Sequence, residues 1–552
     1  MKKLLVFLFS GLFALCLQAQ KLPSGPQVLS IHSTIDDTEQ PYALYIPPNF
    51  DEKATYPLVV MLHGAGSNHR LALRRVFGKS NAPGESDVEA SRYFPEWKDV
   101  NYIVVAPYAR GTAGYQGVVE NDVLQVLEDV KSRFKIDENR IYLTGLSMGG
   151  GGTLWMGLTR PDIWAAIAPV CPAPPAEAIK LIGNALNIPV HFFQGADDPV
   201  VPAEGVRKMA KDMDYLGATV TYEEFPGVLH DSWVNAYADE YVFEWFDKFK
   251  RNPFPERVLF AAAQLKYGKA YWVNFDAISP GNLAEIDARF TDNQNLTINT
   301  KKLEAFTLNL KGHPSLDATK KLKIQLDGKK LDLNPSTTFH FVKKNMKWEA
   351  GEMVKTGMMK KSGSEGPVFD AFSQRHVYVY GTRGNPSEEE LGKRRAQALE
   401  GANWSSYRGE FLGRMMFFPR VISDKEIRPS DLKDANLILF GTKETNQIIA
   451  DMASALPIHL RADDKEHGLL YIYPKGNNYV VINSGLSWWA NSPDQGYPFV
   501  SVVHRNLPTF KDFILFKNSV ETPVIDGYFD TNWKLPSESI NALKSTGNIS
   551  IN

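Results

Sequence analysis

The first half of the chain alternates between short apolar runs and segments with helical periodicity. The apolar runs are rich in valine, isoleucine and phenylalanine, as buried strands are, and lie near residues 57–62, 102–106, 140–144, 164–170, 189–195 and 219–225. Residues 120–134 and 232–250 have helical patterns, the second rich in aromatic residues. Two alternating segments within residues 28–47 predict an antiparallel hairpin or edge pair. Strands that alternate with helices predict a mostly parallel sheet covered on both faces, in a domain at residues 27–251.

The pattern changes at residues 252–255, which read Asn-Pro-Phe-Pro. Residues 256–350 contain short alternating segments separated by polar turns, which predict a small β-sandwich or β-barrel. A glycine- and serine-containing segment from residue 360 predicts a linker. Beyond it, three apolar runs (376–381, 436–441 and 479–485) and two helical patterns (387–399 and 444–455) predict a second, smaller α/β domain at residues 366–540, with some parallel pairing. The predicted fold class is therefore α/β, with a β-rich domain between two α/β domains.

Composition narrows the possible functions. The 552 residues are 43% hydrophobic and carry 61 basic against 63 acidic residues, so neither nucleic acid nor an acidic membrane surface is indicated as a partner. Two lysines followed by an apolar run, ending near Ala19 or Gln20, predict a signal peptide over residues 1–20 and hence a secreted or periplasmic protein. Cys16 does not favour a lipoprotein anchor, because Leu15 is bulky where such sites require a small residue. No other stretch is apolar enough to span a bilayer.

The motif with the clearest chemistry lies at residues 145–149, which read Gly-Leu-Ser-Met-Gly. It follows the apolar run 140–144 and precedes an apolar segment with helical potential. A strand, a sharp turn and a helix are the setting in which the serine of G-x-S-x-G becomes a nucleophile. Small residues are required at Gly145 and Gly149 because side chains there would collide with neighbouring backbone, and Gly150 adds a third small residue. Ser147 is therefore the predicted nucleophile.

A serine nucleophile needs a base and a carboxylate that orients the base, and both follow in the order expected of an α/β-hydrolase. Residues 195–202 read Gly-Ala-Asp-Asp-Pro-Val-Val-Pro after a predicted strand, and the G-x-x-D-x-x-V spacing selects Asp198, with Asp197 as the alternative. His230 lies in the loop after the last predicted strand and is the predicted base. An imidazole must be neutral to accept the serine proton, so activity should fall in acid.

Further site residues are predicted from their positions in loops. The backbone N–H groups of Met148 and Ala65 are the expected oxyanion-hole donors, the second because it lies in a glycine-rich loop after the strand that ends at His63. His63 itself is interpreted as anchoring that loop. Loop residues Arg110 and Tyr115, together with Trp233, are candidates for substrate binding, although ordinary surface loops would have the same composition.

No metal or cofactor is expected. Once the signal peptide is removed, Cys171 is the single cysteine, which excludes an intramolecular disulfide and a cysteine metal site; we interpret it as a small core residue. The remaining histidines, among them His69, His191, His340 and His504, lack partners at metal-ligand spacing.

Residues 42–251 resemble the secreted bacterial esterase- and peptidase-like α/β-hydrolases. The resemblance is carried by the strand and His-Gly-Ala-Gly loop at 57–66, the serine motif at 142–152, the acid loop at 195–202 and the Gly-Val-Leu-His-Asp-Ser-Trp loop at 227–233. Similar proteins include feruloyl esterases, polyhydroxybutyrate depolymerase-like enzymes and the catalytic domain of prolyl oligopeptidase. The resemblance implies an α/β-hydrolase domain that cleaves an ester or amide through an acyl-enzyme, with Ser147, Asp198 and His230 matching position by position.

Three functions remain open from the sequence. The first is a secreted serine carboxylesterase acting on a small-molecule or polysaccharide ester, such as ferulate or acetate groups of plant polysaccharides. The second is a serine exopeptidase of prolyl oligopeptidase type, which is less favoured because no β-propeller sequence lies between the signal peptide and the first strand. The third is a carbohydrate-binding or scaffolding protein, in which Trp488 and Trp489 form a sugar platform. The sequence does not define the oligomeric state.

Overall fold

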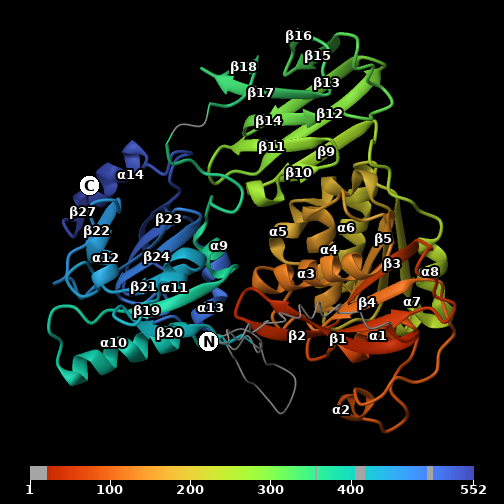
Figure 1. The fold of residues 1–552 in the computed structure, drawn as a ribbon, viewed down its shortest axis with the longest axis horizontal. Helices are drawn as coiled ribbons and strands as arrows, with labels where there is room; N and C mark the ends of the chain where they lie inside the picture. Colours follow the sequence, from red (N-terminus) through yellow and green to blue (C-terminus); the bar gives the residue numbers. More distant parts are fainter. Residues whose placement is uncertain (1–21, 355–356, 405–416, 494–501) are drawn as a thin grey trace, which may run out of the picture.

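The computed structural model describes residues 22–354, 357–404, 417–493 and 502–552 (Figure 1). The predicted signal peptide and Cys16 lie outside these residues. Three regions follow one another along the chain, each built on its own sheet or pair of sheets. Within the described residues, no helix is both long and apolar enough to cross a membrane.

The N-terminal region is an eight-stranded sheet. Its first two strands, at one edge, form an antiparallel hairpin, as the alternating pattern predicted, and the hairpin adds to the sheet through an antiparallel β2–β4 pair. The other five neighbouring pairs are parallel. In spatial order the strands are β1 (Gly25–Ser33), β2 (Thr38–Ile46), β4 (Ile103–Pro107), β3 (Tyr56–Leu62), β5 (Ile136–Leu146), β6 (Ala166–Val170), β7 (Val190–Gly195) and β8 (Val220–Phe225).

Helices cover both faces of this sheet, because its strands carry apolar side chains on both sides. One buried cluster joins the sheet to α3 (Val118–Arg133), α4 (Met148–Thr159) and α6 (Ala203–Tyr215), and a second joins the opposite face to α1 (His69–Val76) and α8 (Tyr241–Phe246). Shorter elements are α2 (Asp87–Ala90), α5 (Ala176–Ile179), η1 (Ile182–Asn187), α7 (Trp233–Ala236) and η2 (Ala238–Glu240).

The predicted closing helix at residues 232–250 is wrong in one respect. It is divided into α7, η2 and α8, because Asp239 and Glu240 have left-handed backbone conformations with φ of 51° and 60°. An α-helix cannot continue through two such residues.

The middle region is a sandwich of two five-stranded sheets. The rings of Phe260 and Phe275, one from each sheet, lie 5.1 Å apart between them. The first sheet has the order β10 (Lys269–Ala270), β11 (Val273–Ile278), β14 (Leu303–Asn309), β17 (Thr338–Lys344) and β18 (Lys347–Ala350). The second has the order β16 (Lys329–Leu333), β15 (Leu322–Leu326), β13 (Asn295–Lys301), β12 (Ala284–Asp292) and β9 (Arg257–Ala262), with η3 (Leu265–Tyr267) between β9 and β10.

The segment predicted as a linker connects this sandwich to the C-terminal region, and it is packed into the junction. Lys360 forms an ion pair with the buried Asp512, and the side chain of Glu365 accepts hydrogen bonds from the backbone N–H groups of Leu265 and Lys266. Burial raises the pKa of Glu365 to about 7.

The C-terminal region is a seven-stranded mixed sheet, and its first four strands are parallel, which confirms the predicted parallel pairing. In spatial order the strands are β20 (Arg420–Ser423), β19 (His376–Tyr380), β21 (Asn436–Phe440), β24 (Asn478–Gly485), β23 (His467–Lys475), β25 (Phe513–Lys517) and β26 (Pro523–Gly527). A separate pair joins β22 (Ile458–Leu460) to β27 (Ile549–Ile551). The helices are α9 (Val368–Phe372), α10 (Glu388–Gly401), α11 (Pro429–Asp434), α12 (Gln447–Asp451), α13 (Val502–Arg505), η4 (Leu507–Thr509) and α14 (Ser537–Ser545).

The tryptophan pair considered as a sugar platform is buried in this C-terminal region. Trp488 and Trp489 are 1% and 8% exposed, and the Trp488 indole N–H donates to the carbonyl of Val503. Their faces are therefore not available to a carbohydrate, and this part of the binding-protein hypothesis is wrong.

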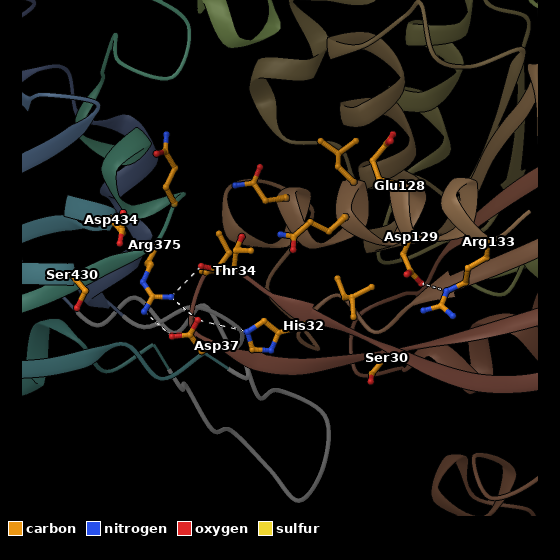
Figure 2. A pocket seen from close by; sticks show the side chains of 16 residues that line it. Ser30, His32, Thr34, Asp37, Glu128, Asp129, Arg133, Arg375, Ser430 and Asp434 are labelled. Atoms are coloured by element: carbon orange, nitrogen blue, oxygen red, sulfur yellow. Dashed lines mark hydrogen bonds and ion pairs between the residues drawn. The ribbon is translucent and has the colours of Figure 1, made fainter. Parts of the chain in front are cut away.

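Direct contacts fix the N-terminal and C-terminal regions against each other. Arg375 forms two hydrogen bonds, of 2.7 and 2.6 Å, with the carboxylate of Asp37, and the side chain of Asn121 in α3 donates to the carbonyl of Ser373. Figure 2 shows the Arg375–Asp37 contact at one end of a cavity of about 1130 Å³, which lies between β1, α3 and the C-terminal region.

Candidate active site

Ser147 lies at the sharp turn between β5 and α4. Its backbone has φ of 54° and ψ of −115°, an unusual conformation for a residue with a side chain. The glycines around it are required by close backbone contacts. A Cβ atom added at Gly145 would lie 2.4 Å from the carbonyl oxygen of Gly149. One added at Gly149 would lie 2.1 Å from the carbonyl oxygen of Leu62, and one added at Gly150 would lie 2.4 Å from that of Val170. The predicted need for small residues at these three positions is confirmed.

The structure brings the predicted nucleophile, base and acid into one hydrogen-bonded chain. The Nε2 atom of His230 lies 2.8 Å from Oγ of Ser147, and its Nδ1 atom lies 2.8 Å from Oδ2 of Asp198. The carboxylate side chain is fully buried, whereas the imidazole is 22% exposed. A neutral imidazole with its proton on Nδ1 would donate to Asp198 and accept the serine proton at Nε2.

The two adjacent aspartates have different partners. Asp198 accepts from the backbone N–H groups of Val200 and Val201 and from the amide of Gln194, in addition to His230. Asp197 instead accepts from the backbone N–H of Gly227, which fixes the neighbouring loop. The geometry therefore favours Asp198 over Asp197 as the carboxylate that orients His230.

The hydrogen bonds around Asp198 also determine its charge. Burial alone would raise the pKa of Asp198, but hydrogen bonds from His230 and from the two backbone N–H groups outweigh it, so the pKa is lowered. The carboxylate therefore stays ionised across the neutral range, as the partner of a histidine base requires.

The loop after β3 passes directly beside Ser147. A Cβ atom at Gly64 would lie 3.6 Å from Cβ of Ser147 and 2.7 Å from the side chain of Leu146. Met148 is the first residue of α4, so its N–H has no partner within the helix. In the part of the chain that the structure describes, neither the Ala65 nor the Met148 N–H donates to a backbone carbonyl outside regular elements or to a side chain. Met148 adjoins the nucleophile along the chain, and Ala65 follows Gly64, which lies against it; their role as oxyanion-hole donors stays a prediction.

Several buried side chains hold this loop in place. The ring nitrogens of His63 each lie 2.7 Å from a carbonyl oxygen, one of Gly64 and one of Tyr108, which confirms the interpretation of His63 as an anchor. Burial lowers its pKa, although the two carbonyl groups favour the protonated ring. The Thr112 hydroxyl accepts from the Gly66 N–H, and the Tyr115 hydroxyl donates to the His63 carbonyl. Thr112 was not anticipated from the sequence, because nothing local distinguishes it from other loop threonines.

Two of the three predicted substrate-binding residues are buried in structural roles. Arg110 is fully buried and forms ion pairs with Asp36 and Asp122. Tyr115 is 3% exposed, and its ring packs against Gly152 of α4. Neither side chain is available to a substrate, so we correct both assignments. Trp233 is partly buried, with its ring edge-to-face against His230 at 5.9 Å, and it alone remains a candidate for substrate contact.

Cys171 is buried, as predicted, and its thiol lies beside the loop that carries His230, 3.6 Å from the carbonyl oxygen of that residue. Among the described residues, Cys171, Asp198 and His230 form the one group of three side chains whose ligand atoms all lie within 4.8 Å of one another. Burial raises the pKa of the thiol to about 12, so it is protonated at neutral pH, when a metal ligand would have to be a thiolate. The other two side chains are already hydrogen-bonded to each other.

Comparison with known proteins gives matches over the same region. The Esterase family model, described as "Putative esterase", matches residues 33–196. A poly(3-hydroxybutyrate) depolymerase from Ralstonia pickettii is 30% identical over 147 residues, which are 23% of this chain and 27% of the relative. Acyl-protein thioesterase 1 from Gibberella zeae is 29% identical over 102 residues, 17% of this chain and 42% of the relative. The chain therefore spans less than half the length of each of these relatives.

Among solved structures, a thermostable esterase is 27% identical, with a TM-score of 0.33, and the match covers 41% of this chain and 63% of that one. The strand order, the serine on its sharp turn and the family match all indicate the same kind of fold for the N-terminal region. Its mixed, largely parallel sheet carries the serine after β5, the acid after β7 and the histidine after β8, in the chain order of the α/β-hydrolase fold. The N-terminal domain of this chain therefore has the α/β-hydrolase fold, and residues 33–196 within it are similar to the esterase family.

Proposed function

We propose that the protein is a serine esterase, with Ser147 as nucleophile, His230 as general base and Asp198 as the acid that orients it. The observation that carries the proposal is the continuous hydrogen-bonded chain from Oγ of Ser147 through both ring nitrogens of His230 to the buried carboxylate of Asp198. A serine hydroxyl is a weak nucleophile until such a chain removes its proton.

The reaction would proceed in two halves. In the first, Nε2 of His230 takes the Ser147 proton while Oγ attacks the ester carbonyl, and the negative charge that develops on the carbonyl oxygen is stabilised by the N–H groups of Met148 and Ala65. The imidazolium then gives its proton to the leaving alcohol, which departs and leaves the acyl group on Ser147. In the second half, His230 takes a proton from water, the resulting attack releases the carboxylic acid, and Ser147 recovers its proton.

The substrate class that we propose is an acyl ester of a plant polysaccharide, such as ferulate or acetate, cleaved outside the cytoplasm. Support for an ester comes from the family match and from the names of the curated relatives, a depolymerase of poly(3-hydroxybutyrate) and a thioesterase. The predicted signal peptide supports secretion to the periplasm or the medium.

A substrate panel on the purified protein tests this proposal. We expect hydrolysis of p-nitrophenyl acetate and methyl ferulate, and release of acid from acetylated or feruloylated xylan, with no hydrolysis of aminoacyl anilides. Cleavage of the anilides in preference to the esters would support an exopeptidase instead. Hydrolysis of p-nitrophenyl acetate without any activity on the xylan esters would retain the esterase and reject the polysaccharide substrate.

A further inference from the structure

A second cavity, of about 910 Å³, lies far along the chain from the serine motif, between the sandwich and the C-terminal region. Its floor is the outer face of the sheet that contains β11, β14 and β17. Its opposite wall is formed by residues 357–362, Ser364 and the turn between β23 and β24. Its size is in the range of sites that hold a small or medium-sized ligand.

The floor carries a row of polar side chains, one from each of four adjacent strands. The strand register pairs Lys269 with Asn274, Asn274 with Thr307, and Thr307 with His340. Side chains at directly opposite positions on one sheet face are about 4.5–5.5 Å apart, so the row presents hydrogen-bonding groups at a regular spacing. Asp276, two residues after Asn274 on the same strand, adds a carboxylate to this face.

Hydrogen bonds within the row determine which of its atoms donate and which accept. The Thr307 hydroxyl donates to Asp276 at 2.5 Å, and its single proton is thereby used. The Nδ1 atom of His340, 2.8 Å from the same hydroxyl, must then donate, which leaves Nε2 of a neutral ring as an acceptor. The amide of Asn274 donates to the other oxygen of Asp276 at 2.8 Å. Each carboxylate oxygen thus accepts one hydrogen bond from a neutral group and retains acceptor capacity for a further donor.

The charges around the cavity do not favour an anion. Among the described residues, four lysines line it. Lys266, Lys269 and Lys360 each form an ion pair with a carboxylate, that of Asp370, Asp162 and Asp512 respectively, and Lys361 donates to the side chain of Asn477. Glu352 adds a second carboxylate to the lining, 3.7 Å from Nε2 of His340. Asp276 itself has no cationic partner within ion-pair distance in the described part of the chain. A phosphate would therefore meet a carboxylate without a surplus of positive charge to balance it.

The wall opposite the row is partly apolar. It includes Met358 and Met359, with Met353 at the rim. A purely apolar ligand would remove water from the polar row without replacing its hydrogen bonds, which is costly. A sugar ring, in contrast, has hydroxyl groups at its edge and C–H groups on its faces, which match the row and the methionines respectively.

We propose that this cavity binds a neutral oligosaccharide, with Asn274, Asp276, Thr307 and His340 hydrogen-bonded to its hydroxyl groups. The proposal is independent of the esterase activity, because none of these residues belongs to the serine site. It assigns to the sandwich and its junction with the C-terminal region a glycan-binding role that the buried Trp488–Trp489 pair cannot have.

Binding can be measured on the full chain carrying Ser147→Ala, so that no ester chemistry interferes. The probes are xylohexaose, cellohexaose and mannohexaose, examined by saturation-transfer NMR and titration calorimetry. We expect at least one to bind, and the double substitution Asn274→Ala with Thr307→Val to weaken its Kd at least tenfold. The matched control is Thr297→Val in β13, a part-exposed threonine of the other sheet, which should leave Kd unchanged.

Absence of binding to all three hexasaccharides at millimolar concentration would overturn the proposal, as would equal weakening by the double substitution and the control. Preferential binding of tetragalacturonate would overturn the assignment of a neutral ligand. If circular dichroism shows that the double variant does not fold, His340→Gln, on the same face, replaces it and should weaken binding by at least threefold; an unchanged Kd would contradict the proposal.

Discussion

The two α/β regions of this chain place similar residues at the ends of their strands and give them opposite environments. Ser147 follows β5 on a strained turn, and its hydroxyl faces a histidine; Ser484 near the end of β24 donates its hydroxyl to the backbone carbonyl of Gly441 at 2.6 Å. Asp198 after β7 orients His230, whereas Asp424 after β20 accepts from the backbone N–H and hydroxyl of Thr382.

The difference is one of local backbone geometry. In the N-terminal domain, glycines allow the β5–α4 turn to project Ser147 away from backbone acceptors. In the C-terminal region, the loop before α12 fills the corresponding edge: its Thr445 carbonyl oxygen would lie 2.1 Å from a Cβ atom at Gly381, and Asn446 bonds the carbonyl of Phe440. A parallel sheet therefore provides the positions, and the turns decide whether those positions are reactive or structural.

The largest effect is expected from removing the predicted nucleophile. Ser147→Ala should lower kcat for p-nitrophenyl acetate by on the order of 10⁴–10⁶-fold, because no activated hydroxyl remains. Ser484→Ala, the matched serine of the other α/β region, should leave kcat within about twofold, since this serine is distant from the chemistry. Steady-state kinetics on both variants, with circular dichroism to verify folding, makes the comparison; equal losses would contradict it.

Substitution of the acid, Asp198, should have the next largest effect on kcat. Asp198→Asn should reduce kcat by up to about 10⁴-fold, because an amide cannot hold the imidazole in its reactive tautomer. Asp197→Asn, which affects one hydrogen bond to the Gly227 loop, should cost less than about tenfold. If the two losses were similar or reversed in order, Asp197 would have to be the acid.

Stability and catalytic rate should depend on pH through different groups, stability through Asp198 and rate through His230. The lowered pKa of Asp198 keeps that group ionised until the pH falls below the ordinary aspartate range of about 3.9, so its contribution to stability is present above that value and is lost only in stronger acid. A protonated imidazole cannot accept the serine proton, so kcat/KM should fall as the pH is lowered, by about tenfold per pH unit on the acid limb. A kcat/KM that stays level well into acid, or that depends on a metal removed by a chelator, would exclude His230 as the base.

A smaller effect is expected from removing the hydrogen bond between Tyr115 and the loop after β3. Tyr115→Phe removes the donor to the His63 carbonyl, a loss of about 1 kcal/mol, or roughly fivefold in kcat if it is felt in the transition state. Tyr378→Phe is the matched control, since that buried tyrosine accepts from Trp404 in the C-terminal region. A change in KM for Tyr115→Phe with kcat unaffected would instead restore Tyr115 to substrate binding.

The sequence was most informative where chemistry depends on local spacing. The glycines at 145, 149 and 150, the strand before them and the Asp198 spacing all follow from neighbouring residues, and the structure places each accordingly. The burial of Arg110 could not be predicted in this way, because its partner Asp36 lies 74 residues away in sequence and Asp122 belongs to a different element. A charged residue in a loop is ordinarily exposed, and only the tertiary fold shows that two carboxylates surround this one.

The same limit explains the other errors of the sequence prediction. The break at Asp239 and Glu240 depends on packing of α8 against the sheet, since the local sequence remains compatible with a helix. The burial of Trp488 depends on α13, in which Val503 contributes the hydrogen-bond acceptor for the indole N–H. The polar row on the sandwich could be recognised only from strand register, because Lys269, Asn274, Thr307 and His340 have no common sequence pattern.

The most direct test of the account is the site of covalent labelling by a fluorophosphonate, which reacts only with an activated serine. Peptide mapping by mass spectrometry should find one equivalent of label on Ser147, none on Ser484, and none anywhere in the Ser147→Ala variant. Stoichiometric labelling at any other residue, or labelling that persists in Ser147→Ala, would contradict the claim that the β5–α4 turn presents the nucleophile.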